Sequence, residues 1–365
     1  MKEEALNSLA EFQVGNSRKI LVAGLLLTLV LVTGLPNIQL ETDFQDSLPD
    51  DLDPIQAQDK VESEFQSSSS ILVLFRNDDT PLRDSSVTDV RDPRMIEMQQ
   101  NLQDELENEP IVSQVNSPAN FFEEKPGSQE EVEATINRLN GEQFYNRDYT
   151  ATQMFIDLEE EMTESNIQEA SEVINENLEN TPQQPGITTT VTGNPIIRTD
   201  IGNFMVEDSV LTISAASLMI LILLSIARGK IYGPITFVPL FIGLLWTLGT
   251  MGHFGIPLTI ATIALGAMIL GLGVEYGSFI TERIIEEIEE QGSVEDAVRE
   301  AVPTTGLAIL GSSTTTVVGF SALLIASISF IRNLGLTLAL GIILTVISAL
   351  VITPALIIEY ERWNR

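Results

Sequence analysis

The chain contains no cysteine and only one histidine among 365 residues, and both scarcities remove chemistry from consideration. Without cysteine it can form neither a disulfide nor a thiolate metal site. The lone histidine, His253, cannot plausibly serve a serine–histidine–aspartate triad, and no cluster of metal ligands is visible. The pattern G-x-x-x-x-G-K-[ST] is also missing. The sequence therefore does not support an enzyme, a bound cofactor or metal, or a P-loop ATPase.

Basic residues are also few. The chain has 19 Lys and Arg against 52 Asp and Glu, which gives a net charge of -33. Between Asn37 and Met205 the ratio is 9 to 36. Such an acidic segment would repel phosphate, which argues against nucleic acid as a partner. The excess indicates a solvated acidic surface, as in halophilic proteins, or alternatively a surface that attracts cations.

Long hydrophobic runs, by contrast, are plentiful. They predict a polytopic α-helical membrane protein with one large soluble domain. The first run could be a secretory signal peptide, but no A-x-A cleavage site follows it, so we expect an uncleaved helix. The predicted transmembrane helices are 20–36, 210–227, 234–251, 257–281, 302–327 and 331–358.

Lysine and arginine mark one side of the membrane. They cluster in the N-terminal segment 1–19, beside 228–230, in the segment 282–301 and in the C-terminal segment 359–365. The positive-inside rule places these four regions in the cytoplasm. We therefore expect a multi-pass protein of the cell membrane with both termini cytoplasmic and 37–206 outside. Segment 282–301 should be an amphipathic cytoplasmic helix.

The soluble segment alternates strand and helix patterns. Its order, β-α-β, a connecting helix, then β-α-β, is typical of an α+β ferredoxin-like sandwich. Helix 128–139 opens with the capping-box pair Ser128 and Glu131. The predicted elements are strands 70–76, 111–115, 150–158 and 187–192 and helices 93–108, 128–139 and 163–178.

One acid lies inside a predicted transmembrane helix. Glu275, followed by Tyr276, is six to seven residues from the first aqueous charges, Glu282 and Arg283. Ionisable groups at membrane depth usually face other helices or a wet cavity and mark ion or proton pathways. The alternative is that Glu275 extends to the cytoplasmic interface, although glutamate is short for this.

Two further patterns lie near this acid in the expected bundle. Five consecutive hydroxyl residues run from Ser312 to Thr316; one or two could face Glu275, or they could bond to their own backbone. The helix that carries Glu275 lacks side chains at three glycines, Gly271, Gly273 and Gly277. This favours close packing against neighbouring helices and could also allow the helix to slide against them.

These motifs resemble the RND superfamily. The stretch Gly271-Leu-Gly-Val-Glu-Tyr276, followed by Thr281-Glu-Arg283, Pro303-Thr-Thr305 and Thr314-Thr-Thr-Val-Val-Gly-Phe320, is similar to the branch of MmpL proteins, hopanoid exporters and Patched. The resemblance covers most of the chain. It implies one helix, an outer porter domain ending near Thr192-Gly-Asn-Pro195, and a five-helix block like a sterol-sensing domain.

The resemblance also implies a function: export of a hydrophobic or amphipathic substrate such as a lipid, driven by the proton motive force. The family's proton-binding Asp corresponds to Glu275 here, with Tyr276 and, more weakly, Thr314, Thr315 and Thr316 completing the relay. Sodium could replace the proton. Glutamate instead of aspartate lengthens the side chain by one methylene, which changes the relay geometry.

Typical family members contain two such halves, and this chain shows one half without an internal repeat. The second half would come from another copy in a dimer or trimer, from a different subunit, or not at all. A non-transporting lipid sensor or scaffold is the alternative function. An accessory subunit of protein export, like SecD and SecF, is another.

Overall fold

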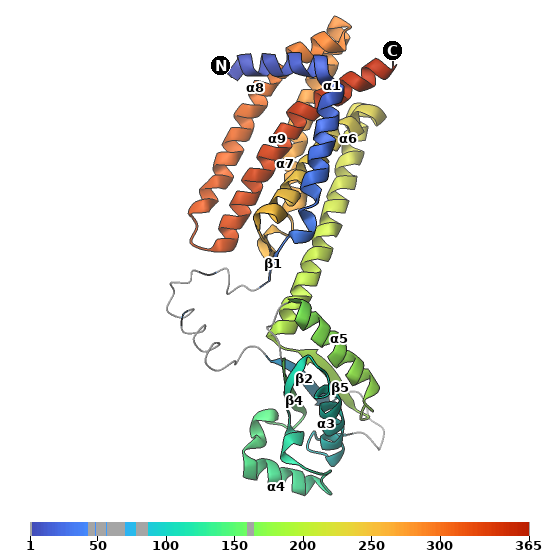
Figure 1. Cartoon of the computed structure of the whole chain (residues 1–365), viewed down its shortest axis with the longest axis vertical. Coiled ribbons are helices and arrows are strands. Elements are labelled where there is room, and N and C mark those ends of the chain that lie inside the picture. Colours follow the sequence, from blue (N-terminus) through green and yellow to red (C-terminus); the bar gives the residue numbers. More distant parts are fainter. Residues whose placement is uncertain are drawn as a thin grey trace. The chain divides into compact units, whose positions relative to one another are not determined.

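The computed structural model describes residues 2–42, 48, 56, 70–77, 87–158 and 164–364. The chain forms two compact units: Met1–Pro49 with Gly202–Arg365, and Asp50–Ile201. Figure 1 shows that the first unit consists mainly of long helices, whereas the second is built on a small sheet.

The sheet unit confirms the strands and helices predicted for this part of the chain. Its four strands lie in the order β3-β4-β2-β5, with every neighbouring pair antiparallel. The predicted helix start at Thr163 lies outside the described residues. The elements are β2 (Ile71–Asn77), α3 (Pro93–Leu106), β3 (Val112–Asn116), α4 (Gln129–Leu139), β4 (Ala151–Leu158), α5 (Glu164–Asn180) and β5 (Ile187–Thr192).

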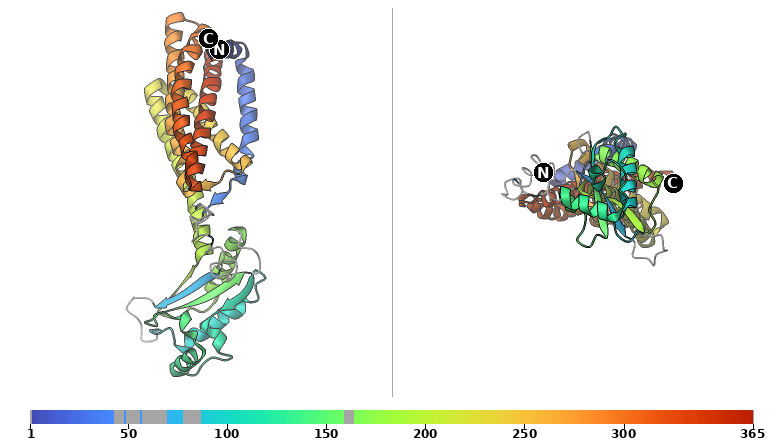
Figure 2. Two further views of the ribbon diagram at one scale, coloured as in Figure 1. Left: turned by 90° about the vertical axis from the view of Figure 1, so that its left-hand side faces the viewer. Right: turned by 90° about the horizontal axis from the view of Figure 1, so that it is seen from below.

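The core of this unit lies on one face of the sheet. Alternate residues of β2, namely Ile71, Val73 and Phe75, are fully buried because successive strand residues point to opposite faces. They form one cluster with apolar side chains of α3 and α5, so both helices cover the same face (Figure 2). Helix α4 packs separately, against Ile96.

Side-chain caps begin two of these helices. The Asp92 carboxylate accepts a hydrogen bond from the backbone N–H of Arg94 at the start of α3. The Ser128 hydroxyl accepts from the Glu131 N–H at 3.3 Å, as the capping box predicts. The Glu131 carboxylate, however, accepts from the N–H of Gly127, one residue before the helix cap. Orphan N–H groups are thereby satisfied at both helix starts.

The first unit is a helical bundle. Within the described residues, five helices are long and apolar enough to cross a membrane, which identifies a polytopic membrane protein. Both termini lie at one end of the bundle, and the short strand β1 lies at the other (Figures 1 and 2). The helices are α1 (Lys2–Val32), α6 (Asn194–Phe254), α7 (Leu265–Gln291), α8 (Val294–Ser321) and α9 (Ser329–Asn364).

Helix α9 is the centre of this bundle and α8 lies at its edge. In the most apolar stretch of α9, 72% of the residues are buried inside the chain, against 11% for α8. Helix α9 packs against α1, α7 and α8. It also meets α6, where Gly243 lies against the backbone of Thr345.

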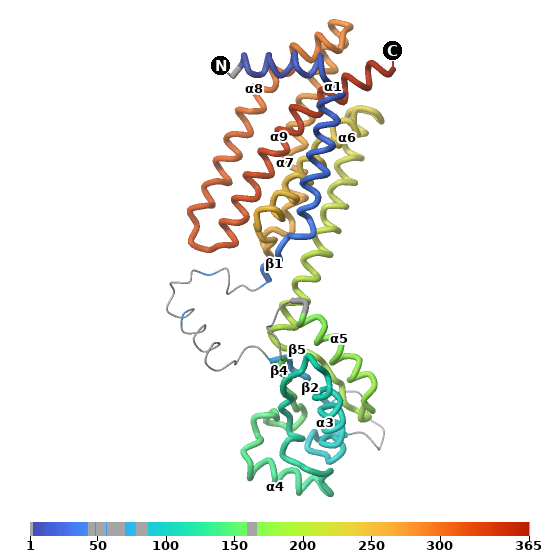
Figure 3. Tube along the Cα trace, in the orientation of Figure 1, coloured from blue at the N-terminus to red at the C-terminus, as the bar shows by residue number. Residues whose placement is uncertain are grey.

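Helix α6 is interrupted at Gly229, between the predicted transmembrane helices 210–227 and 234–251. Gly229 has φ 83° and ψ 169°, a conformation that glycine adopts without steric cost. A Cβ added at Gly233 would lie 2.6 Å from the Cα of Ser225. Residues eight apart approach so closely only where the chain doubles back, and the trace turns at the end of the bundle that holds the termini (Figure 3).

The acid-bearing helix begins later than predicted. Leu258 and Thr259 form β6, which pairs in parallel with β1 (Leu40–Glu41), and a 3-10 turn follows at Ile260–Thr262. Thr259 and Thr262 cap each other's backbone. These polar pairings hold the chain out of the α-helix, which therefore begins at Leu265 rather than near 257.

The predicted amphipathic helix 282–301 is in fact two helices. Helix α7 ends at Gln291, Gly292 adopts φ 73°, and α8 begins at Val294. Left-handed glycine is a common helix terminator. Ser293 then caps α8 by accepting from the Asp296 N–H.

The N-terminal segment 1–19 is helical up to a kink, which was not predicted from the sequence. Helix α1 is kinked at Asn16 (φ −136°, ψ 28°). Before the kink, Leu6, Ala10 and Val14 are buried at a spacing of four residues, which makes one apolar face. This face packs into the same cluster as residues of α7, α8 and α9.

Candidate functional site

Glu275 lies on the outer surface of the single chain. It is ten residues into α7, about three helical turns from its start. Its side chain is exposed, and no described residue forms a hydrogen bond or ion pair with it. Met268, Gly271 and Phe279 are also exposed. With Glu275 they follow the helical spacing of three to four residues, so they form one outward-facing stripe.

Tyr276 points the other way, into the bundle. Its side chain is 2% exposed and belongs to the apolar cluster that joins α7, α8 and α9. Its hydroxyl lies beside the Thr316 side chain of α8. Successive residues of a helix are about 100° apart, so the Glu275–Tyr276 pair connects the outer surface of α7 to its packed interior.

The threonines of the hydroxyl run on α8 lie partly on the exposed surface and partly beside the buried Tyr276. The Thr314, Thr315 and Thr316 hydroxyls each donate to a carbonyl of their own helix. Thr314 and Thr315 are exposed, and Thr316 alone of the three lies beside Tyr276. These three hydroxyls thus follow the alternative in which the run bonds to its own backbone, and Glu275 is exposed in the single chain. That one or two hydroxyls of the run face Glu275 stays a prediction.

Of the three α7 glycines predicted to pack, two lie against other helices and one lies on the exposed face. A Cβ at Gly273 would lie 2.6 Å from Thr345 Cγ2 of α9, and one at Gly277 would lie 3.0 Å from Leu240 Cδ2 of α6. Both therefore permit close helix approach. Gly271 has no atom within 4 Å of its Cβ position. Within the described part of the chain its Cβ position therefore faces open space, contrary to the prediction that Gly271 packs against another helix.

Polar contacts attach the second half of α7 to α6. The Thr236 hydroxyl donates to the buried Thr281 hydroxyl at 3.0 Å, and Arg228 donates to Glu282 at 2.7 Å. The hydrogen bond from Arg228 lowers the pKa of the Glu282 carboxyl below its ordinary value, so this acid stays ionised near neutral pH. This attachment could not be predicted from the sequence, because no short-range pattern links residues of separate helices.

Sequence comparisons agree with this architecture. Residues 46–365 match the MMPL family. "Putative membrane protein MJ1562" of Methanocaldococcus jannaschii is 30% identical over 99% of this chain and 95% of its own length. The protein translocase subunit SecD of Rickettsia prowazekii is 30% identical, but over only 34% of this chain and 24% of its own length.

A shorter match is with "Putative membrane protein ActII-3" of Streptomyces coelicolor, 28% identical over 27% of this chain and 14% of that protein. The family match covers the sheet unit and the helices α6 to α9 together, including Glu275. The chain therefore belongs to the MMPL family, and through it to the RND superfamily.

Proposed function

We propose that the chain is a half-size RND-type secondary active transporter that exports a hydrophobic or amphipathic substrate, such as a lipid, on the proton motive force. It would reside in the cell membrane with both termini cytoplasmic. Family membership supports the transporter class. The residues of α7 and α8 support the mechanism.

The observation that carries the proposal is the outward position of Glu275 in an apolar helix. An acid at membrane depth costs roughly 2.5–3.5 kcal/mol on insertion scales, and such residues almost always face protein or water. The single chain leaves Glu275 uncovered. We therefore infer that a second copy, or a second half-transporter subunit, covers this face in a dimer or trimer.

In this assembly Glu275 would bind a proton from outside and release it to the cytoplasm. One charge crossing 100 mV provides roughly 2.3 kcal/mol, enough to shift a two-state balance about fifty-fold. Tyr276 and Thr316 would extend the relay into the bundle. Thr314 and Thr315, exposed on α8, would act at the subunit interface.

The sheet unit would be the extracytoplasmic porter domain. Its antiparallel order β3-β4-β2-β5, with α3 and α5 on one face, supports a ferredoxin-like sandwich. Opening and closing of this domain would release the substrate. The break of α6 at Gly229 supports six transmembrane helices, with α6 supplying two of them.

Substitution of Glu275 by glutamine tests the proton mechanism. In vesicles with an imposed pH gradient, Glu275→Gln should remain folded and lose transport, because an amide cannot exchange a proton at neutral pH. Glu286→Gln, on the exposed part of α7 near its end, is the matched control and should transport normally. Varying sodium and pH separately identifies the coupling ion.

Normal transport by Glu275→Gln would sink this mechanism. A non-transporting lipid sensor or scaffold predicts instead that neither the parent protein nor Glu275→Gln transports lipid. In that case the sensing or scaffolding function survives Glu275→Gln and is lost on changes in the sheet unit. The partial match to SecD keeps a role in protein export as the second candidate. It predicts that secretion of unfolded polypeptide, rather than lipid content, changes when the gene is deleted.

A further inference from the structure

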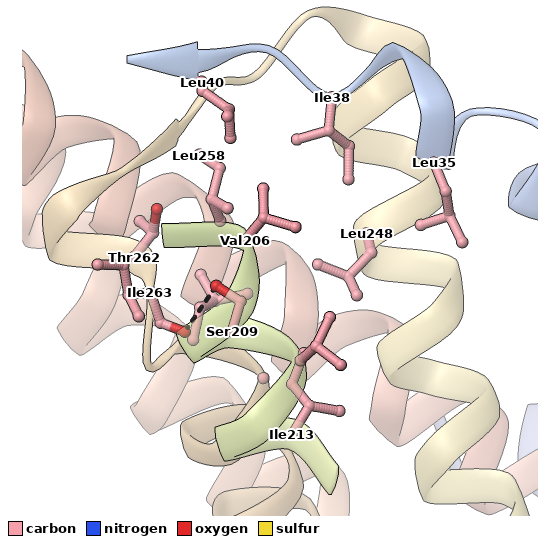
Figure 4. A pocket seen from close by; sticks show the side chains of 13 residues that line it. Leu35, Ile38, Leu40, Val206, Ser209, Ile213, Leu248, Leu258, Thr262 and Ile263 are labelled. Carbon is pink, nitrogen blue, oxygen red and sulfur yellow. Dashed lines mark hydrogen bonds between the residues drawn. The ribbon is translucent and has the colours of Figure 1, made fainter. Parts of the chain in front are cut away.

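The bundle contains an apolar cavity at the end opposite the two termini. Its volume is about 250 Å³. The walls come from the turn after α1, from β1, from both halves of α6, and from the stretch between β6 and the start of α7 (Figure 4). Leu35, Leu40, Ile213, Leu248 and Gly266 are examples from these walls.

The lining offers almost nothing to a polar ligand. Of the described lining residues, two carry hydroxyls, Ser209 and Thr262. Both already donate: Ser209 to the Ile263 carbonyl at 3.4 Å and Thr262 to the Thr259 carbonyl at 2.9 Å. Among the residues that the structure describes, no charged side chain lines the cavity. Water is therefore poorly held here, since a buried water needs two to four polar partners.

The size and access fit a hydrocarbon chain. An apolar cavity of about 150 Å³ stays dry and takes up benzene, and this one is larger. Filling it restores dispersion contacts that an empty lining lacks. Val210, at its margin and at the start of the predicted transmembrane helix 210–227, is 60% exposed, so the cavity opens beside the first turn of that helix, where the surrounding lipid begins. A chain could enter sideways without leaving the hydrocarbon.

We propose that this cavity binds one hydrocarbon chain of a membrane lipid. The inference deepens the proposed export function and rests on it for the identity of the lipid as cargo. The start of α7 supplies one wall, and Gly266 stands nine residues before Glu275 on that helix. A shift of α7 would therefore change the wall of the lipid site directly.

The test is photolabelling of the full-length protein in phosphatidylcholine vesicles. A fraction of the lipid carries a diazirine on one acyl chain, and labelled peptides are mapped by mass spectrometry without any pH gradient. The label should concentrate on the cavity walls, above the level on other lipid-facing segments. Figure 4 shows the side chain of Val206 directed into the cavity, so Val206→Trp should abolish that enrichment.

Two comparisons make the outcome decisive. Leu211→Trp, on α6 and 64% exposed but outside the cavity lining, should leave the enrichment unchanged. Val210→Trp serves as a second filling variant if Val206→Trp fails to fold. Even labelling of all lipid-facing helices, or enrichment that survives in a folded filling variant, would overturn the proposal.

The labelling and the transport assay can fail separately. If the cavity is labelled while Glu275→Gln transports normally, the lipid site stands and the proton mechanism falls. If Glu275→Gln is inactive and the cavity is not enriched, the transporter stands and this site is wrong.

Discussion

At the residue scale, the candidate site consists of two neighbours with opposite environments. Glu275 is exposed on the chain's surface, while Tyr276 is buried. The sequence was sufficient to locate the acid and its depth in the apolar run. It was not sufficient to tell which way the acid points, because a helix that is apolar all round carries no periodicity that reports its packed face.

The packing of Gly273 leads to a stability prediction. Gly273→Val should lower stability by about 1–3 kcal/mol, because added side-chain atoms would overlap Thr345 Cγ2 on α9 and overpacking costs this much. The measurement is thermal unfolding of the detergent-purified protein. Ala215→Val, an exposed position on α6, should stay near the parent; equal losses in both variants would contradict the packing argument.

At the element scale, local sequence signals such as glycine determine where most helices and strands begin and end. The exceptions depend on pairing with residues far away in the chain. The breaks at Gly229 and Gly292 fall where glycine permits positive φ, and the strands of the sheet unit matched their patterns. The late start of α7 depends instead on β6 pairing with β1. That partner lies before the whole sheet unit in the chain, so no window of sequence around α7 could reveal it.

The start of α3 should respond to acid. The hydrogen bond from Arg94 lowers the pKa of the Asp92 carboxyl, so the folded value lies below the ordinary one of about 3.9. The stabilisation is complete above the ordinary pKa and is lost as pH falls through the folded value. We expect the sheet unit to weaken below about pH 4.

Two substitutions separate the charge from the cap. Asp92→Ala should cost about 1 kcal/mol at neutral pH, whereas Asp92→Asn should keep most of the cap. Both remove the carboxyl, so both should reduce the loss below about pH 4. Urea unfolding of the full-length protein followed by far-ultraviolet circular dichroism measures both. An acid transition unchanged in Asp92→Asn would exclude this carboxyl as its origin.

At the scale of the whole molecule, the uncovered stripe on α7 predicts self-association. Gly271→Leu should shift the detergent-purified protein toward monomer, because Gly271 lies one turn from Glu275 with open space at its Cβ, and a large side chain there would separate two copies. Native mass spectrometry gives the copy number. Ala215→Leu is the control; a parent protein that is already monomeric with its lipids retained would refute the arrangement.

The central position of α9 has a consequence for biosynthesis. This helix follows α1, α6, α7 and α8 in the chain, yet it supplies the surface against which each of them packs. During translation the earlier helices must therefore be inserted in the bilayer before the surfaces that pack against α9 are covered. One of these surfaces is the one around Gly273. Interrupting synthesis before Ser329 would leave a set of inserted helices without the helix against which they pack. The product would be an unassembled intermediate that membrane quality control degrades, rather than a shorter transporter.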